Sequence, residues 1–284
     1  MTISVSVSLP ESRMHAVPVP LVAAKAMASI NGHANQNPLG LAHGSLYEAC
    51  VAMREKVDSF LAEELQTPLL RSAQEQVRIS VRVVEEALER YRYISISYNG
   101  GKDCLVMLIV LLACYARRYS PPKSALAASV ANGPASLPPF PDKLHAVYIV
   151  SADPFAEVDA FVESSSADYH LDIARFTLPM KKGLEVFKAE NPSIRAIFVG
   201  TRRTDPHGEK LKHFDPTDAG WPDFMRIHPV IDWHYTEIWA GYTSLGGRGD
   251  TLPNPRLKKQ GNDKEFRPAY ELVDDDEERL GRFK

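Results

Sequence analysis

The sequence predicts an α/β fold in which helices flank a mainly parallel β-sheet. One observation is the β-branched run Ile94–Ser97, which enters a glycine turn and is followed by the apolar run Leu105–Leu112. Another is a regular β-α-β-α-β alternation between Leu144 and Gly200. Such alternation covers a parallel sheet with helices and places ligands at the carboxyl ends of the strands. With 284 residues, 44% hydrophobic and 24% charged, the chain has the composition of a globular protein with one substantial core.

Two helices are predicted ahead of the first strand. Ser45 and Glu48 form a capping-box pattern, which marks the start of a helix and of the ordered chain. A second apolar stripe at helical spacing runs from Leu70 to Tyr91 and leads into the strand at Ile94. We interpret both stripes as faces that pack in the core and not as cofactor contacts.

Composition divides the rest of the chain. Residues 1–44 hold many Ser, Ala, Val and Pro and few charges, so we expect a disordered extension there. Residues 45–240 are expected to form the α/β domain, interrupted at 119–142 by a flexible insertion rich in Pro, Ala and Ser. Residues 241–284 are expected to form a C-terminal extension. Within the alternating region we expect strands at Leu144–Val150, Leu171–Thr177 and Ala196–Gly200, and helices at Glu157–Ser164 and Met180–Ala189.

The turn after the first strand, Y-N-G-G-K-D-C at 98–104, predicts a phosphate-binding loop. A strand, a glycine turn and a helix N-terminus bring several backbone N–H groups to one point, where the helix dipole favours an anion. Gly100 and Gly101 allow a close approach because neither has a Cβ. The alternative is an ordinary turn with Lys102 and Asp103 in solvent, but chance rarely places Asn, two Gly, Lys and Asp together at such a turn.

The loop is not a Walker A motif. That motif needs an earlier glycine, where the chain has Ile96, and Ser or Thr after the lysine, where the chain has Asp103. The pattern instead resembles the PP-loop of the adenine-nucleotide α-hydrolases, which cleave ATP between its α- and β-phosphates. We therefore expect a Rossmann-like PP-loop domain.

A second polar cluster follows the strand predicted at Ala196–Gly200. The segment G-T-R-R-T-D-P-H-G-E at 200–209 combines cations, an acid and turn formers, a set that suits phosphates and a metal. Further along, W-P-D-F-M-R-I-H-P at 221–229 offers an aromatic face beside Arg226. His207 and His213 lack companion ligands at metal-site spacing and are interpreted as loop histidines.

Five motifs in order make the resemblance specific. N-G-G-K-D-C, T-D-P-x-G-E, W-P-D-F-x-R-I-x-P, Y-T-S-L-G and a terminal Y-x-L-V-D-D-x-x-E-R-x-G-R together resemble the eukaryotic FMN adenylyltransferase, or FAD synthase, family over roughly 45–284. The resemblance implies a PP-loop fold related to PAPS reductases. It also implies transfer of AMP from ATP to FMN, giving FAD and pyrophosphate, with Mg²⁺ as the inferred metal.

The resemblance also assigns residues by position. It implies catalytic or phosphate-linked roles for Asn99, Asp103, Asp205, Arg279 and Arg282, the last two on one face of a terminal helix. It implies nucleotide contacts for Tyr98, Gly100, Gly101, Lys102, Ile149, Ser151, Gly200 and Arg202. It implies flavin-side contacts for Gly220, Trp221, Pro222, Asp223, Arg226 and His228. Direct metal ligands remain open.

Two departures from the family pattern concern the site. Thr201 and Arg203 stand where the family usually has Ile and His. In addition, the family continues the helix after E-I-W, whereas here Trp239-Ala240 is followed directly by Gly241-Tyr242. We therefore expect a short helix from about Tyr235 and an incomplete wall of the flavin pocket, which leaves open a flavin-nucleotide-binding protein with impaired or no turnover.

Charge and cysteine content limit partners and location. A net charge of −3 gives no whole-molecule attraction for nucleic acid or an anionic membrane, and the longest apolar run is far shorter than the ~20 residues of a membrane span. We expect small-molecule partners, ATP and FMN, and a monomer. Cys50, Cys104 and Cys114 show no CxxC spacing, which favours a reducing, cytoplasmic location; a mitochondrial form is the alternative.

A PAPS-reductase-like oxidoreductase of the same fold is the competing enzyme. Its chemistry needs a nucleophilic cysteine late in the chain, and no cysteine follows Cys114. The sequence therefore favours the adenylyltransferase.

Overall fold

The structure is a computed structural model, and it describes residues 44–120, 138–151, 153, 155–239, 254–259, 262–267 and 271–280. A six-stranded sheet in the order β3-β2-β1-β4-β6-β5 forms its centre. Its strands are β1 (Ile94–Ser97), β2 (Leu144–Ile149), β3 (Leu171–Phe176), β4 (Ala196–Phe198), β5 (Phe214–Pro216) and β6 (Met225–Ile227). Every pairing is parallel except that of β5 with β6, which confirms the predicted mainly parallel sheet.

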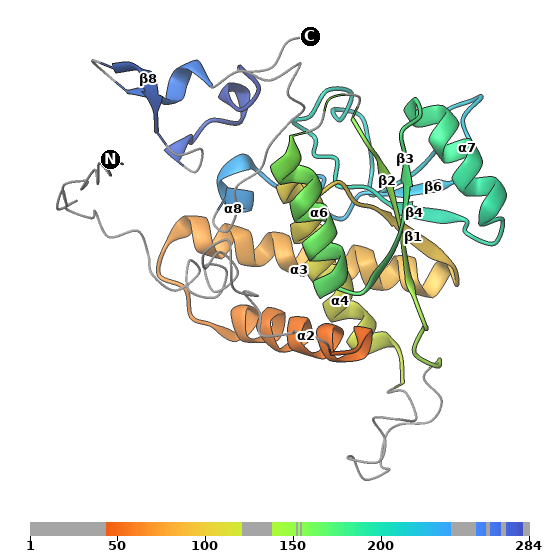
Figure 1. The fold of residues 1–284 in the computed structure, drawn as a ribbon. Coiled ribbons are helices and arrows are strands. Elements are labelled where there is room, and N and C mark those ends of the chain that lie inside the picture. The colour runs from red at the N-terminus through yellow and green to blue at the C-terminus, as the bar shows by residue number, and fades with distance from the viewer. Residues whose placement is uncertain are drawn as a thin grey trace, which may run out of the picture.

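Helices cover both faces of the sheet (Figure 1). One face carries α2 (Leu46–Ala62), α3 (Pro68–Arg90), α4 (Lys102–Arg118) and α6 (Ala156–Asp168), whose apolar residues share one large core. The other face carries α7 (Met180–Glu190), which packs in a smaller cluster with Val147 and Ile197. Odd and even residues of a strand face opposite sides, so β2 contributes Ala146 to one core and Val147 to the other.

The helix boundaries follow local sequence signals. Ser45 and Glu48 form both bonds of the predicted capping box at the start of α2. Thr67 accepts a hydrogen bond from the Leu70 amide and Pro68 occupies the first turn of α3, so that helix begins slightly before the predicted apolar stripe. α4 runs from Lys102 to Arg118, beyond both ends of the apolar run that predicted it.

Two strands and a terminal helix depart from the sequence expectations. β5 and β6 were not predicted, because strands of three residues are too short to show a period of two. The helix expected around Arg279 and Arg282 is absent from the described part of that segment: a 3₁₀ turn, η4 (Asp275–Glu277), is followed by a turn through residue 280. Arg282 lies outside the described residues.

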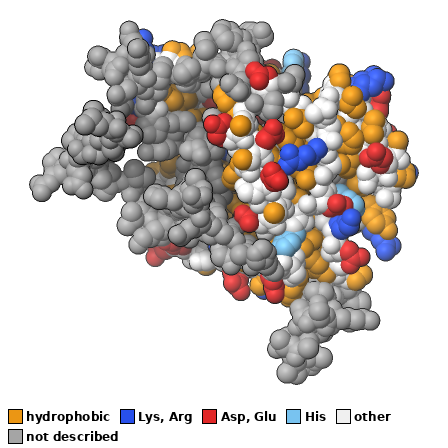
Figure 2. Space-filling view, viewed as in Figure 1, with side chains coloured by type: hydrophobic (Ala, Val, Ile, Leu, Met, Phe, Trp, Pro, Cys, Tyr) orange, Lys and Arg blue, Asp and Glu red, His pale blue; other side chains and the backbone are white. Residues whose placement is uncertain are grey.

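The remaining elements follow the sheet. α8 (Tyr235–Trp239) is described over five residues, up to the last residue before the undescribed range 240–253, and it packs against α3. A 3₁₀ turn, η2 (Pro255–Leu257), and a hairpin of β7 (Lys258–Lys259) and β8 (Asn262–Phe266) come next. No helix in the described ranges is long and apolar enough to cross a membrane. Acidic and basic side chains are interspersed on the face seen in Figure 2.

Most of the expected insertion at 119–142 lies outside the described residues, but its two ends are packed. The Tyr119 and Phe140 rings lie 6.2 Å apart, and the Tyr47 ring meets Phe140 edge to face at 5.3 Å. The expected N-terminal extension, 1–44, is described only at Gly44.

Candidate active site

The phosphate-loop turn joins β1 to α4 at the carboxyl edge of the sheet. Gly100 adopts φ +71°, and a Cβ there would lie 2.8 Å from Val162 Cγ2, so both the backbone and the space require glycine. The Asn99 side-chain oxygen accepts a hydrogen bond of 2.9 Å from the Gly101 amide and fixes the turn. Gly101 is the N-cap of α4 and supplies no side-chain cap. The first amides of α4 therefore have no intrahelical acceptor, a geometry that suits an anionic ligand.

The second predicted cluster lies beside this turn because β4 pairs with β1. The register aligns Ile96 with Phe198, so both strands end at the same edge. A Cβ on Gly200 would lie 2.9 Å from Cys104 Sγ and 3.0 Å from the Cys104 amide nitrogen. Glycine at this position therefore lets the chain after β4 approach the first turn of α4, as the parallel-sheet prediction required.

Two buried cations face each other across the two loops. Arg202 is 0% exposed and Lys102 is 4% exposed. Lys102 Nζ lies 3.0 Å from Asp103 Oδ2, and Arg202 Nε lies 2.8 Å from Asp103 Oδ1. Asp103 thus links the phosphate loop to the loop after β4. Charges removed from water to this extent require partners, so this cluster is the electrostatic centre of the site.

Asp205 shapes the loop after β4. Its carboxylate accepts a hydrogen bond of 2.9 Å from the Arg202 amide and lies 3.7 Å from the Arg202 guanidinium. It also accepts a hydrogen bond of 2.9 Å from Arg279 Nη1. A Cβ on Gly208 would lie 2.1 Å from the Arg202 carbonyl oxygen, so this tight loop excludes any side chain there. The predicted residues Lys102, Asp103, Arg202, Asp205 and Arg279 therefore form one connected cluster.

Sequence reasoning missed two carboxylates of this cluster, Asp275 and Glu278. Glu278 Oε1 lies 2.6 Å from Lys102 Nζ, and Glu278 Oε2 contacts the Arg202 guanidinium. Asp275 lies 3.6 Å from Arg202 Nη1 and also binds the His234 ring at 2.6 Å. Both belong to the terminal D-D-x-x-E-R motif, in which the sequence analysis assigned roles to the arginines and none to the acids.

The surroundings keep these groups charged. Burial opposes the charge on Glu278, but Lys102 and Arg202 outweigh it and lower the pKa of that carboxyl below its usual value. Burial likewise opposes the charge on Arg202, and Asp103 and Glu278 outweigh it and raise the pKa of the guanidinium. The cluster is therefore ionic at neutral pH.

Several buried atoms of the cluster make no hydrogen bond. Arg202 Nε lies close to Asp103 Oδ1, yet the N–H is not directed at the oxygen, so the contact is an ion pair and leaves both atoms without a hydrogen bond. Arg202 Nη1 has none either. Unsatisfied buried donors are uncommon in proteins, and here they lie where an anionic ligand would accept them.

The same residues include two carboxylates that could hold the inferred Mg²⁺. Asp103 Oδ1 is buried without a hydrogen bond, and Asp103 and Asp205 contact one guanidinium group. Mg²⁺ bound to a nucleotide needs only one or two carboxylates besides phosphate oxygens and water. The pair fits that role, while within the described residues no group of three or more His, Cys, Asp or Glu would hold a metal by itself.

The predicted flavin-side residues lie mainly on the loop that joins β5 to β6. Phe224, at the base of this loop, packs against Phe187 near the end of α7, with ring centroids 6.4 Å apart. A Cβ on Gly220 would lie 3.8 Å from Lys181 Nζ in the first turn of α7. The loop thus lies beside α7 and brings Gly220 near a side chain of the first turn of that helix. Trp221, the next residue, is 38% exposed.

The other predicted flavin-side residues differ in burial and in their hydrogen-bond partners. Arg226 Nη2 donates to the Pro216 carbonyl at 2.9 Å, and Nη1 lies 3.5 Å from Asp218. The Pro222 carbonyl accepts a hydrogen bond of 2.7 Å from the Thr217 hydroxyl, and Asp223 is exposed.

His228 is buried, and neither ring nitrogen has a hydrogen-bond partner. Burial and the nearby Arg226 lower the pKa of His228 to about 4.

Three predicted nucleotide residues lie at the edges of this arrangement. Tyr98 is fully buried and donates to the Ser165 hydroxyl at 2.8 Å, so its side chain belongs to the core and only its backbone remains for a ligand. Ile149 packs toward α7, where a Cβ on Gly183 would lie 2.6 Å from its Cδ1. Ser151 is exposed just beyond β2. Their nucleotide contacts remain predictions.

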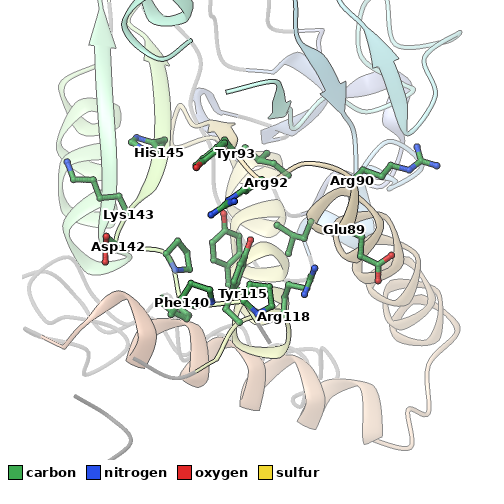
Figure 3. Close-up of a pocket in the computed structure, with 16 residues that line it drawn as sticks. Glu89, Arg90, Arg92, Tyr93, Tyr115, Arg118, Phe140, Asp142, Lys143 and His145 are labelled. Carbon is green, nitrogen blue, oxygen red and sulfur yellow. The ribbon is translucent and has the colours of Figure 1, made fainter. Parts of the chain in front are cut away.

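A separate hollow of about 960 Å³ lies at the opposite edge of the sheet (Figure 3). Arg92, Tyr93, Tyr115, Arg118 and Phe140 are among the residues that line it. Both α3 and α4 end in its wall. The hollow therefore lies at the amino edge of the sheet, away from Lys102 and Arg202.

Comparison with known proteins agrees with this geometry. A family profile, the phosphoadenosine phosphosulfate reductase domain, matches residues 177–245, which include β4 and the loop that carries Arg202. The probable FAD synthase of Schizosaccharomyces pombe is 39% identical over 226 residues, covering 74% of this chain and 79% of the relative. The flavin adenine dinucleotide synthase of Saccharomyces cerevisiae is 30% identical over 255 residues, covering 80% and 82%.

A solved structure extends the likeness to three dimensions. The Candida glabrata FMN adenylyltransferase, crystallised with FAD and inorganic pyrophosphate, matches with a TM-score of 0.71 and 27% identity, over 84% of this chain and 99% of that one. The likeness to these relatives covers most of this chain and most of each relative. The chain belongs to the FAD synthase family.

Proposed function

We propose that this chain is an FMN adenylyltransferase that transfers AMP from ATP to FMN and releases pyrophosphate. One observation carries the proposal: in a member of the FAD synthase family, the uncapped N-terminus of α4, Lys102 and Arg202 meet at the carboxyl ends of β1 and β4. This arrangement provides backbone donors and two buried cations at one place, as a triphosphate requires.

The reaction needs no side-chain nucleophile. An FMN phosphate oxygen forms a new P–O bond to the α-phosphorus of ATP, the bond to the bridging oxygen breaks, and pyrophosphate leaves with that electron pair. A phosphate monoester is already largely ionised at neutral pH because its second pKa is near ~6. Catalysis then rests on holding the two phosphates in line and stabilising the charge that develops on the leaving group.

The cluster residues divide these tasks. Lys102 and Arg202 are placed to neutralise phosphate charge, and the guanidinium of Arg202 supplies donors that lack hydrogen bonds in the unliganded chain. Asn99 keeps the loop amides in position through its bond to Gly101. Asp103 and Asp205 orient Arg202 and would hold Mg²⁺, which when bound supplies further charge neutralisation to the phosphates.

The loop between β5 and β6 is the proposed flavin side. Trp221 is exposed at the tip of this loop, and an indole face there suits stacking on the isoalloxazine ring. Arg226 is held by Pro216 and Asp218 and keeps a guanidinium near the same loop. The solved relative that binds FAD carries the same fold, which supports this placement.

Incubation of the purified full chain with ATP, Mg²⁺ and FMN tests the proposal. We expect FAD, detected by chromatography and fluorescence, and an equal amount of pyrophosphate. A folded chain that yields neither product contradicts the proposal. Lys102→Ala should remove both products, and because it also removes two buried ion pairs, circular dichroism must show that the variant is folded before its activity is compared.

A flavin-nucleotide-binding protein without turnover is the second candidate. The observation that favours it is in the sequence, where Trp239-Ala240 is followed directly by Gly241-Tyr242 although the family continues the helix at this point. Calorimetry that detects FAD binding in a chain that forms no product would select this candidate. The same assays on a version with the family's helical segment inserted after Ala240 would show whether the shortening is responsible.

We further propose a monomer in a reducing, cytoplasmic setting. The three cysteines are free and buried, which supports a protein that keeps its thiols reduced. Light scattering of the full chain and fractionation of cells that express it are the direct checks.

A further inference from the structure

The anion site of the unliganded chain already contains more negative than positive groups. Its cations are Lys102, Arg202 and Arg279, and its carboxylates are Asp103, Asp205, Asp275 and Glu278. A triphosphate adds several more negative charges to this cluster. The site in this arrangement is therefore electrostatically unsuited to the nucleotide that the rest of its geometry fits.

Two of the four carboxylates come from the C-terminal segment, residues 271–280. Asp103 lies in the first turn of α4 and Asp205 in the loop after β4, whereas Asp275 and Glu278 reach the site from the C-terminal segment. When Glu278 alone leaves, Lys102, Arg202 and Arg279 balance Asp103, Asp205 and Asp275. Removal of the Glu278 carboxylate thus ends the excess of negative charge at the site, while Asp275 stays in place.

Glu278 holds the position that a phosphate group would take. One carboxylate oxygen lies 2.6 Å from Lys102 Nζ and the other contacts the Arg202 guanidinium. A non-bridging pair of phosphate oxygens makes the same two contacts with a lysine and an arginine. Lys102 and Arg202 are nearly inaccessible to solvent, so a phosphate cannot be added beside Glu278 and must replace it.

We propose that Glu278 is an internal competitor of ATP: its carboxylate occupies a phosphate position in the unliganded enzyme, and the nucleotide binds by displacing it. The inference rests on the proposed function, since ATP is the ligand. Glu278 thereby sets the apparent affinity for ATP, because the affinity is reduced by the fraction of molecules in which the phosphate position is open. It also keeps two buried cations paired when no nucleotide is present.

Other contacts keep the segment near the site after Glu278 is released. Leu272 packs with Tyr235 and Leu257 in a small buried cluster. Asn254 donates to the Glu277 carbonyl at 2.7 Å, and Asp275 binds His234 and the Tyr235 amide. Displacement therefore requires a local change around Glu278 and leaves the apolar anchor of the segment in place.

Two variants of identical charge change test the competition. Glu278→Gln keeps the shape but removes the negative charge, whereas Glu277→Gln makes the same change one residue away, where the carboxylate pairs with Arg256 at 2.7 Å and not with the site. Calorimetry would use Mg²⁺ and an ATP analogue with a methylene group between the α- and β-phosphates. We expect Glu278→Gln to bind the analogue about tenfold more tightly than wild type and Glu277→Gln to bind it within about twofold of wild type.

Unchanged or weaker binding by folded Glu278→Gln would overturn the proposal, since it would make Glu278 an anchor of the closed site. Hydrogen exchange on the wild-type chain gives a second measurement that needs no variant. Displacement predicts faster amide exchange in 271–280 when the analogue is bound, whereas a segment that closes over the nucleotide would exchange more slowly. Slower exchange would also overturn the proposal.

The experiments distinguish a failure of the competition from a failure of the proposed function. Wild-type protein that forms FAD, together with Glu278→Gln that binds the analogue no more tightly, would reject the competition and keep the adenylyltransferase. Wild-type protein that binds no analogue and forms no FAD would reject the adenylyltransferase itself.

Discussion

Arg202 shows how a single side chain can connect the site. It is fully buried, follows β4, and contacts carboxylates from the phosphate loop, from its own loop and from the C-terminal segment. A guanidinium has five donors in a rigid plane, so it can meet these partners simultaneously, which a lysine ammonium cannot do with the same geometry. In the unliganded chain, Arg202 is therefore held in place by several carboxylates, and some of its N–H donors make no hydrogen bond.

We predict that Arg202→Lys lowers kcat/KM for FAD formation by about 100-fold, because charge remains but directed donors to the phosphates are lost. The matched control is Arg203→Lys, where the native arginine is partly exposed and pairs with Asp232 at 2.6 Å. The control should keep activity within a few-fold. Equal losses in the two variants would contradict the assignment of Arg202.

Gly100 and Gly220 both adopt positive φ, +71° and +82°, but differ in the space around them. Alanine at either position should cost about 1–2 kcal/mol of stability from the backbone. Gly100→Ala should cost more, because its Cβ would lie 2.8 Å from Val162, whereas the Cβ of Gly220→Ala would lie 3.8 Å from a lysine terminus. Urea unfolding of both variants measures the difference, and equal losses would show that Val162 yields without cost.

At the scale of elements, the phosphate site depends on the start of α4. The helix begins without a side-chain cap, and its first turn contains the buried Lys102. Natural helices are usually capped by Ser, Thr, Asp or Asn, and omission of the cap leaves amide donors for a ligand. Helix α4 is thus less stable than it would be with a capping side chain. An anion bound to its free amides would restore that stability.

Pyrophosphate, the proposed product, should therefore stabilise the folded chain. At saturating concentration we expect an increase in the midpoint of thermal unfolding of several degrees, since a ligand at about 100 times its Kd adds about 2.7 kcal/mol. The increase should be absent in Lys102→Ala, and sodium chloride at the same ionic strength serves as the salt control. An equal increase in wild type and variant would indicate that the anion binds elsewhere.

At the scale of the whole molecule, two helical layers enclose the sheet and bury His228 in its interior. Burial keeps this imidazole neutral and lowers its pKa from 6.5 to about 4. The unfolded chain takes up a proton as the pH falls below about 6.5, and the folded chain does not until about 4. His228 therefore costs stability as the pH falls through this window, by at most about 3 kcal/mol.

His228→Leu should reduce this acid sensitivity. We expect the free energy of unfolding of wild type to fall between about pH 7 and about pH 5 by more than that of the variant, measured by urea denaturation at both values. Other titrating groups contribute equally to both proteins and cancel in the comparison. An identical pH dependence would show that His228 titrates normally in the folded chain.

The fold and much of the site follow from short-range sequence patterns. The capping box at Ser45 and Glu48, the strand at Ile94 and the glycine turn after it are local features, and each was predicted correctly because their geometry depends on neighbouring residues. Alternation of strands and helices implied the parallel sheet. β5 and β6 escaped prediction because three-residue strands are defined by their partners and not by their own pattern.

The sequence by itself determined the phosphate-binding turn, the carboxyl-edge location of the site and the family. Only the tertiary structure decided that Glu278 and Asp275 join the cluster of Lys102 and Arg202, that Tyr98 turns into the core and that Gly220, next to Trp221, lies near the first turn of α7. Glu278 and Lys102 are 176 residues apart. Such a contact depends on the order of strands and the path of the whole chain, which no local propensity encodes, whereas a glycine turn before a helix is specified by the residues that form it.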